Sequence, residues 1–232
     1  IASSELNSSI TSNAVDTGTT SSNRDISYDD ISSILNTKTD NEAAAYQALF
    51  STWGKTYATE TRATACQQAR AASLNCLFKR GNLNTLKTHN RPAVLTLVNA
   101  QGETRYITIT AINEVSATIH SNNRAYQVKL GDIDKYWFGK FLILWKKPEN
   151  YTSVILPGDS GEIINWLNTQ ILKVNNDFSD MIVNTYDERL INKVKTFQSQ
   201  HGLTADGIVG PITIIYLNTQ TGTDTPTLSQ QG

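Results

Sequence analysis

Residues 91–112 read RPAVLTLVNAQGETRYITITAI, and this stretch decides the fold of the first half of the chain. Its first part, 92–98, is apolar and rich in β-branched residues, which favours a strand. Turn residues follow at 99–103, where Gly102 can adopt a positive φ. From 104 to 112 the side chains alternate, with tyrosine and threonine on one face and isoleucine on the other, which predicts a second strand. The stretch therefore predicts antiparallel strands joined by a tight turn.

The sequence on either side of this stretch predicts helices first and then more strands. Phe141–Trp145 is apolar on both faces, so we expect it to be a central closing strand. A loop is expected around Leu74-Asn75-Cys76. Helices are expected at 42–53, 61–73 and 82–89, and further short strands at 116–120 and 125–130. Helices followed by an antiparallel sheet indicate an α+β domain, which we place at residues 42–150.

A second, smaller module of three helices is expected at residues 154–218. Its first helix begins near Ser160, a plausible N-cap, and the second spans Asp187–His201. Gly202 then serves as the C′ glycine, and Pro211 opens the last helix.

Both ends of the chain are polar. Residues 1–41 are rich in Ser, Thr and Asn and read as a flexible linker, and 219–232 read as a flexible tail. A short amphipathic turn at Tyr28–Leu35 leaves two alternatives, packing onto the body or docking a partner.

Charge and composition exclude several classes of function. The chain has 20 Lys and Arg residues against 21 Asp and Glu residues, and its pI is near 6.3. This balance argues against a nucleic-acid binder and against attraction to an anionic membrane surface. No apolar run approaches the roughly 20 residues that span a bilayer. Because the first residue is Ile1 rather than Met, we interpret the chain as a processed or excised soluble piece. The histidines and cysteines lack metal-site spacing, so we expect neither a metal nor a cofactor.

A glycine-rich motif lies in the second module. It comprises Phe197-Gln198, Gly202-Leu203, Asp206-Gly207-Ile208-Val209-Gly210-Pro211, Thr213 and Leu217. In this pattern the module resembles the peptidoglycan-binding domain found at the ends of many bacterial wall enzymes. The resemblance implies that the module holds peptidoglycan, because the amides of such a loop can meet carbonyls or carboxylates of a stem peptide. The implied binding residues are Gln198, Asp206, Gly207, Ile208, Gly210 and Thr213. The alternative is that these residues only build the fold.

The first domain carries a second set of motifs. They are Trp53-Gly54, Cys66-Gln67-Gln68-Ala69, Leu74-Asn75-Cys76, Asn90–Leu95, Tyr106, Trp137-Phe138-Gly139 and Phe141–Trp145. In these the domain resembles the papain-like domain called peptidase C39-like. Together with the wall-binding module, it resembles the periplasmic region of the general secretion pathway protein A family of bacterial type II secretion.

The family resemblance implies a location and partners. The chain would be the periplasmic part of an inner-membrane protein of a Gram-negative bacterium, attached to the membrane only through an N-terminal span that is absent from this sequence. Its partners would be peptidoglycan, the companion general secretion pathway protein B and the secretin, with no nucleic acid. Its role would be non-enzymatic, helping the outer-membrane channel to assemble through the cell wall.

The first domain contains only part of a cysteine-peptidase triad. Cys66 opens a predicted helix, where the helix dipole favours a thiolate, so it stands at the nucleophile position. The position expected for the catalytic histidine holds Tyr106, and a phenol with a pKa of about 10 is no base at neutral pH. The expected Asp is also missing, so we predict no catalytic residues. The alternative is a wall-targeted cysteine peptidase or amidase that uses Cys66 with His120 as base. A third possibility is an assembly protein whose wall module has lost binding.

The resemblance to a periplasmic protein also bears on the two cysteines. In an oxidising compartment Cys66 and Cys76 are expected to form a disulfide. On one straight helix they would be about 15 Å apart, so a disulfide requires a break between them. Ser73-Leu74-Asn75 offers one, since Asn can adopt the left-handed conformation. The alternative is two buried free thiols.

Overall fold

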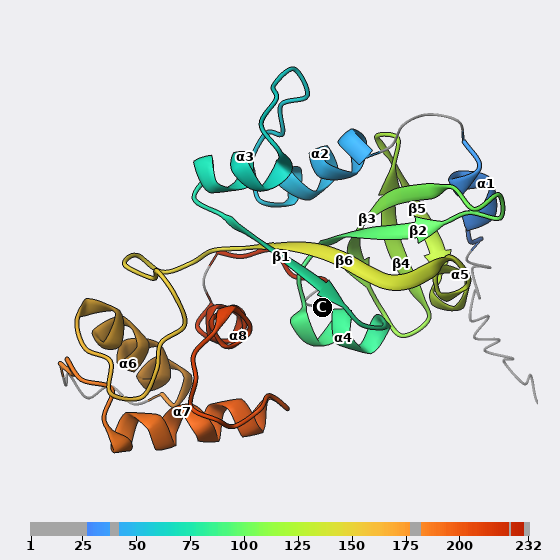
Figure 1. Ribbon diagram of the computed structural model, residues 1–232. Coiled ribbons are helices and arrows are strands. Elements are labelled where there is room, and N and C mark those ends of the chain that lie inside the picture. The colour runs from blue at the N-terminus through green and yellow to red at the C-terminus, as the bar shows by residue number, and fades with distance from the viewer. Residues whose placement is uncertain (1–26, 38–41, 177–181, 223, 230–232) are drawn as a thin grey trace, which may run out of the picture.

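The computed structural model describes residues 27–37, 42–176, 182–222 and 224–229 (Figure 1). Within them the strands form one antiparallel six-stranded sheet in the order β1-β6-β2-β3-β4-β5. The strands are β1 (Asn75–Arg80), β2 (Ala93–Val98), β3 (Thr104–Ile112), β4 (Ser116–Ser121), β5 (Arg124–Lys129) and β6 (Trp137–Trp145). The helices are α1 (Ile31–Leu35), α2 (Glu42–Thr52), α3 (Ala65–Ala71), α4 (Leu83–His89), α5 (Leu130–Tyr136), α6 (Glu162–Val174), α7 (Glu188–Gln200) and α8 (Pro211–Gln220). The expected α+β fold followed by a three-helix module is confirmed.

The predicted pair of strands at 92–112 is present as β2 and β3. Their register runs from Ala93 opposite Ile109 to Val98 opposite Thr104. Gly102 has a φ of 80° in the turn between them, as the sequence predicts. β6 lies between β1 and β2, so the central position predicted for its apolar end is also confirmed.

The loop expected around Leu74-Asn75-Cys76 is wrong, because Asn75 and Cys76 belong to β1, which pairs with β6 along its whole length. The register runs from Asn75 opposite Trp145 to Arg80 opposite Lys140. The sequence of β1, NCLFKR, shows no clean alternation of buried and exposed residues, and its second half is exposed. The apolar partner strand therefore creates β1 through a pairing that local sequence does not reveal.

Helices α2 and α3 cover one face of the sheet. Leu49 and Phe50 of α2 and Ala69 of α3 are buried there against residues of β2 and β6. A polar bond also ties α2 to the sheet, because the hydroxyl of Thr108 donates to the carbonyl of Ala45 at 2.5 Å. This layer lies above the sheet in Figure 1.

The opposite face of the sheet packs against α1, α4, α5 and part of the C-terminal module. Ile31, Ile34 and Leu35 of α1 are buried in this core. Of the two alternatives for the amphipathic turn at Tyr28–Leu35, packing onto the body is therefore the one observed, and the expected linker does not include residues 31–35. Residues 1–26 and 38–41 lie outside the described residues.

The three helices of the C-terminal module begin and end largely where the sequence predicts. α7 is capped by Asp187, whose carboxylate accepts from the N–H of Leu190 at 2.9 Å. Gly202 has a φ of 66°, and the N–H of Leu203 donates to the carbonyl of Gln198, as in a Schellman motif. α6 differs, since its N-cap is Gly161 rather than Ser160.

The two domains share one continuous hydrophobic core. At their junction Arg91 is 1% exposed, and its Nη2 donates to the carbonyl of Ile215 in α8 at 3.1 Å. Nearby, Nδ2 of Asn218 donates to the carbonyl of Lys146 at 2.9 Å. The module is therefore packed against the first domain rather than tethered to it.

The expected flexible tail at 219–232 is wrong for residues 224–229, which return to the first domain. Leu228 is buried, and its carbonyl accepts from the N–H of Ile112 at 2.9 Å. Asn90 ends α4 in the left-handed conformation, and its Oδ1 accepts from the N–H groups of Leu228 and Ser229. One apolar side chain and a fixed Asn cap are enough to hold an otherwise polar segment. Residue 223 and residues 230–232 lie outside the described residues.

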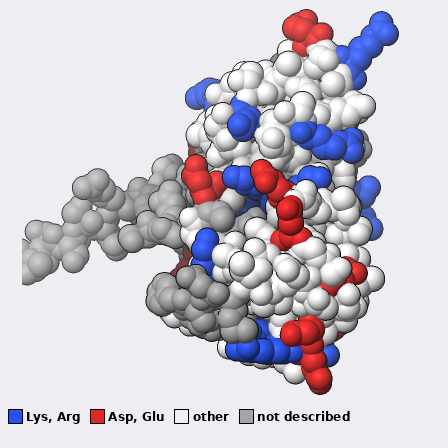
Figure 2. Space-filling model, turned by 90° about the vertical axis from the view of Figure 1, so that its left-hand side faces the viewer, with Lys and Arg blue, Asp and Glu red and all other residues white. Residues whose placement is uncertain are grey.

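Charged side chains of both signs are interspersed on the face seen in Figure 2, in keeping with the net charge of -1. None of the described helices is long and apolar enough to cross a membrane.

Candidate functional site

The loop between α7 and α8 contains the residues that the sequence proposes for wall binding, and Gln198 is its centre. The side chain of Gln198 is 1% exposed. Its Oε1 accepts from the N–H of Gly207 at 2.9 Å, and its Nε2 donates to the carbonyl of Ile208 at 2.9 Å. Longer bonds from Nε2 reach Asp206 Oδ1 at 3.3 Å and Thr213 Oγ1 at 3.4 Å. Gln198 therefore uses its amide to hold the loop, and Thr213 is buried beside it.

Gly207 occupies a position that only glycine fits. Its φ is 79°, and an added Cβ would lie 3.1 Å from Cγ2 of Ile191 and 3.2 Å from Cε of Lys195. Its carbonyl accepts from the hydroxyl of the buried Tyr186 at 2.7 Å. Burial, and secondarily the charge of Asp206, raise the pKa of that hydroxyl, so it stays a donor across the physiological range. Gly207 thus shapes the loop from within.

Asp206, Ile208 and Gly210 are the predicted residues that reach the surface of this loop. Asp206 is exposed and turns the chain, since its Oδ1 accepts from the N–H of Ile208 at 2.8 Å. Ile208 is 38% exposed and Gly210 is half-buried. The loop therefore presents a carboxylate and an apolar side chain side by side.

Two further apolar residues join this surface through an antiparallel bridge that the sequence did not predict. Ile155 and Val209 exchange backbone hydrogen bonds of 3.1 and 3.0 Å, and both side chains are buried. Residues adjacent to a bridged pair point to its other side, so Leu156 lies beside Ile208 and Val154 beside Gly210. Leu156 and Val154 are each 43% exposed. We call the surface of Val154, Leu156, Asp206, Ile208 and Gly210 the loop face. In the sequence, the apolar run Val154-Ile155-Leu156 is a signal of this surface.

In the first domain, the candidate nucleophile is already bonded. Cys66 is the second residue of α3, behind the N-cap Thr64, and its sulfur forms a disulfide with Cys76 of β1. The Cα atoms of the two cysteines are 5.5 Å apart. The predicted break between them is present, but Ser73, with a φ of 62°, adopts the left-handed conformation instead of Asn75.

Phenols surround the position where a catalytic base would stand. Tyr106 of β3 packs against the cluster under α2 and α3, which also contains Tyr46 and Tyr57. The rings of Tyr46 and Tyr57 are 5.5 Å apart, and Tyr46 donates to Glu42 Oε1 at 3.4 Å. Burial, the charge of Glu42 and the neighbouring phenols raise the pKa of Tyr46 above its ordinary value. A neutral phenol of this kind cannot take a proton from a thiol.

His120, the alternative base, lies in β4 opposite Thr108 of β3. Burial lowers the pKa of its imidazole. No hydrogen bond between His120 and Cys66 is found among the described residues, and Cys66 carries no thiol proton to give. The structure therefore places the candidate residues of the triad in one domain without assembling a triad.

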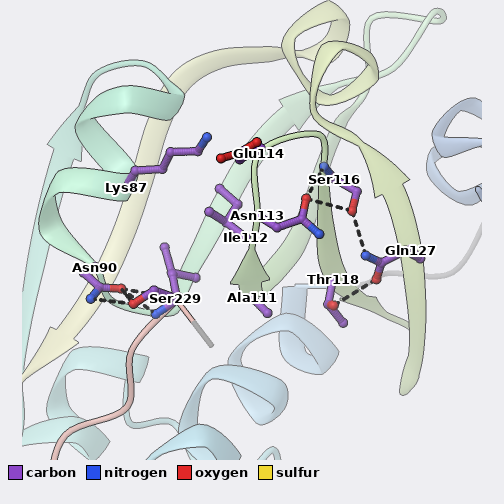
Figure 3. Close-up of a pocket in the computed structure, with 11 residues that line it drawn as sticks. Lys87, Asn90, Ala111, Ile112, Asn113, Glu114, Ser116, Thr118, Gln127 and Ser229 are labelled. Carbon is purple, nitrogen blue, oxygen red and sulfur yellow. Dashed lines mark hydrogen bonds between the residues drawn. The ribbon is translucent and has the colours of Figure 1, made fainter. Parts of the chain in front are cut away.

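A cavity of about 570 Å³ lies between α4, the β3–β4 turn and the C-terminal segment. Figure 3 shows that its polar side chains are largely bonded to one another. Gln127 donates to Ser116 and accepts from Thr118, at 2.9 and 3.0 Å, while Asn90 turns to Ser229. Lys87 and Glu114 stand at its rim. We interpret it as the joint where the C-terminal segment docks, outside the predicted site. No group of three or more potential metal ligands occurs in the described part of the chain.

Comparison with known proteins agrees with this architecture. Residues 31–147 match the family described as "GspA, peptidase C39-like domain", and residues 160–217 match the putative peptidoglycan binding domain. General secretion pathway protein A of Aeromonas hydrophila is 28% identical over 188 residues, which cover 81% of this chain and 34% of that protein. A putative general secretion pathway protein A of Escherichia coli K12 is 27% identical over 177 residues, covering 76% of this chain and 35% of that protein. The chain thus spans about a third of the length of these relatives.

A solved structure shares the fold. It is a periplasmic domain of the EpsAB fusion protein of the Vibrio vulnificus type II secretion system, with a TM-score of 0.53 and 20% identity. The match covers 84% of this chain and 83% of that one.

Proposed function

The chain belongs to the GspA peptidase C39-like family, and from that membership we propose that it is a non-enzymatic peptidoglycan-binding protein of type II secretion. In this proposal the C-terminal module holds the wall while the first domain contacts the secretion machinery. The chain would thereby help the outer-membrane channel to assemble through the wall. Its location would be the periplasm, as part of an inner-membrane protein.

The observation that carries the proposal is the loop face. Gln198, Tyr186 and Gly207 fix the backbone from inside, so that Asp206 and Ile208 are held in one position at the surface. A preorganised loop loses little entropy on binding. Among the predicted residues, Gln198, Gly207 and Thr213 would act as supports, and Asp206, Ile208 and Gly210 would contact the wall.

The disulfide supports a first domain without catalysis. A sulfur bonded to Cys76 cannot attack a carbonyl, and Tyr106 supplies no base. A disulfide is also typical of a compartment outside the cytoplasm. The first domain would then serve as a scaffold for the companion general secretion pathway protein B and the secretin.

Co-sedimentation with purified peptidoglycan sacculi tests the proposal. The full chain should be used, because the two domains share a core. Wild-type protein is expected to pellet with sacculi, and an I208D/L156D variant to stay in the supernatant. V115D is the matched control, since Val115 is also exposed but belongs to the β3–β4 turn of the first domain. If the wild-type chain stays in the supernatant, the module does not bind the wall and the proposal fails.

Thiol titration of the native protein tests the absence of catalysis. Without reductant and without denaturant, no free thiol is expected. A reactive thiol at Cys66 would support the wall-targeted peptidase or amidase instead.

A further inference from the structure

The free edge of the sheet has properties that wall binding does not use. β1 is the outermost strand, next to β6. No described residue makes a backbone hydrogen bond to the outer side of residues 75–80. The other edge, β5, is different. The backbone N–H of Asp29 donates to the carbonyl of Gln127, and the carboxylate of Asp29 accepts from the N–H of Gln127, both at 2.7 Å. The chain thus covers one edge of its sheet with its own residues and leaves the other open.

β1 is held rigidly although it is an edge strand. It pairs with β6 over all six residues, and the disulfide joins its second residue to α3. Figure 1 shows β1 running between α3 above and α4 below. An edge fixed in this way needs no ordering before a further strand pairs with it.

One side chain of β1 favours association. Natural edge strands avoid exposed apolar residues, because an open apolar edge recruits other chains. Phe78, in the middle of the open part of β1, is 68% exposed. Phe138, at the start of the neighbouring β6, is 65% exposed. An exposed aromatic side chain on an open edge offers an apolar contact to a strand that pairs with it.

Three cationic side chains lie near Phe78 in the sheet. Lys79 and Arg80 follow it in β1, and Lys140 lies opposite Arg80 in β6. All three are exposed, and none forms an ion pair with a described residue. Because strand side chains alternate, Arg80 shares the face of Phe78 and Lys79 lies on the opposite face. A strand that pairs here therefore meets cations on both of its faces.

We propose that the outer edge of β1 is a docking site for an extended acidic segment of a partner protein, which adds a strand to the sheet. The segment places an apolar side chain against Phe78 and carboxylates against Lys79 and Arg80. Backbone bonds supply the affinity, and the cross-strand side-chain pairs supply the selectivity. A second copy of this chain is a poor occupant, since pairing β1 with β1 would gather the same cations from both copies. The site stands whether or not the C-terminal module binds peptidoglycan.

The test uses the full chain and a short capped synthetic peptide in which a central valine has two glutamates on each side, so that carboxylates can face both Lys79 and Arg80. Binding is measured by fluorescence anisotropy, and hydrogen exchange locates the site. The peptide is expected to bind and to protect the amides of residues 75–80. Replacing glutamate by lysine in the peptide should abolish binding. N-methylation of the peptide amides that face β1 should also abolish it, because N-methylation removes the donors of a strand pairing.

Variants of the chain complete the test. F78S and the double variant K79E/R80E are each expected to weaken binding about tenfold or more, which corresponds to about 1.4 kcal/mol. I182S is the control, since Ile182 is even more exposed but lies in the C-terminal module. Because Phe78 is exposed, F78S should leave the melting temperature unchanged.

Four results would overturn the proposal. They are equal binding of the N-methylated peptide, unchanged exchange in β1, an equal loss in I182S, and a dimer of the chain that F78S dissolves.

Discussion

Replacing Gln198 by leucine tests whether this side chain holds the loop or contacts a ligand. In the native chain its amide pairs with the N–H of Gly207 and the carbonyl of Ile208, each at 2.9 Å. Leucine has a similar size but bonds to neither group. The change therefore removes the loop's internal bonds while leaving Asp206 and Ile208 in the sequence.

The expected cost follows from the groups left unpaired. Gly207 is buried, so its N–H cannot turn to water. A buried backbone group without a partner costs roughly 1–3 kcal/mol, and with the less buried carbonyl of Ile208 we expect Q198L to lose about 3 kcal/mol of unfolding free energy. Urea unfolding followed by tryptophan fluorescence measures this loss, and it should be accompanied by weaker binding to sacculi.

A glutamate at the same position adds a pH dependence with a defined sign. The carboxylate keeps the acceptor for Gly207 but places an oxygen near Asp206 Oδ1, which Nε2 now approaches to 3.3 Å. Like charges so close raise the pKa of the new carboxyl in the folded state above its value of about 4.3 in the unfolded chain. The folded state then binds more protons, so stability is regained as the pH falls through the raised pKa. Q198E should have a lower free energy of unfolding than Q198L at neutral pH. It should regain stability in mild acid.

One outcome would refute this reasoning. If Q198L unfolds within about 0.5 kcal/mol of the wild type, as an ordinary surface substitution would, yet no longer binds sacculi, Gln198 is a ligand contact and not a support. I208D is the matched comparison, because it should lose binding with little loss of stability.

Three further predictions concern the rest of the fold. The C66S/C76S variant should stay folded but lose about 3 kcal/mol in urea unfolding, the chain-entropy value for so short a loop; an unchanged midpoint would mean that the disulfide constrains nothing. Burial lowers the pKa of His89, so the unfolded chain binds the extra proton and stability should fall as the pH drops below about 6.5. H89F should flatten that part of the pH profile of the melting temperature, and an unaltered profile would contradict the assignment. L228A should cost about 3 kcal/mol, typical of a buried leucine, whereas a loose tail would show no effect in calorimetry.

The sequence by itself determined the features that depend only on residues close together along the chain. The alternation in 104–112 and the turn at Gly102 specify a pair of strands wherever they are placed. Gly202-Leu203 and Pro211 likewise define one helix end and one helix start, because positive φ and a missing N–H are local properties. The loop motif around Asp206 and Gly207 could be recognised for the same reason.

Only the tertiary structure decided which residues are paired, covered or exposed. β1 exists because β6 offers it a partner, and α1 and Leu228 are ordered because a core elsewhere in the chain receives them. The sequence predicts Gln198 as a binding residue, whereas its burial and four hydrogen-bond partners, which only the fold reveals, favour the supporting role that Q198L tests. Pairing and burial join residues far apart in the chain, so no local pattern encodes them, and the loop face and the open edge of β1 appear only once the chain has folded.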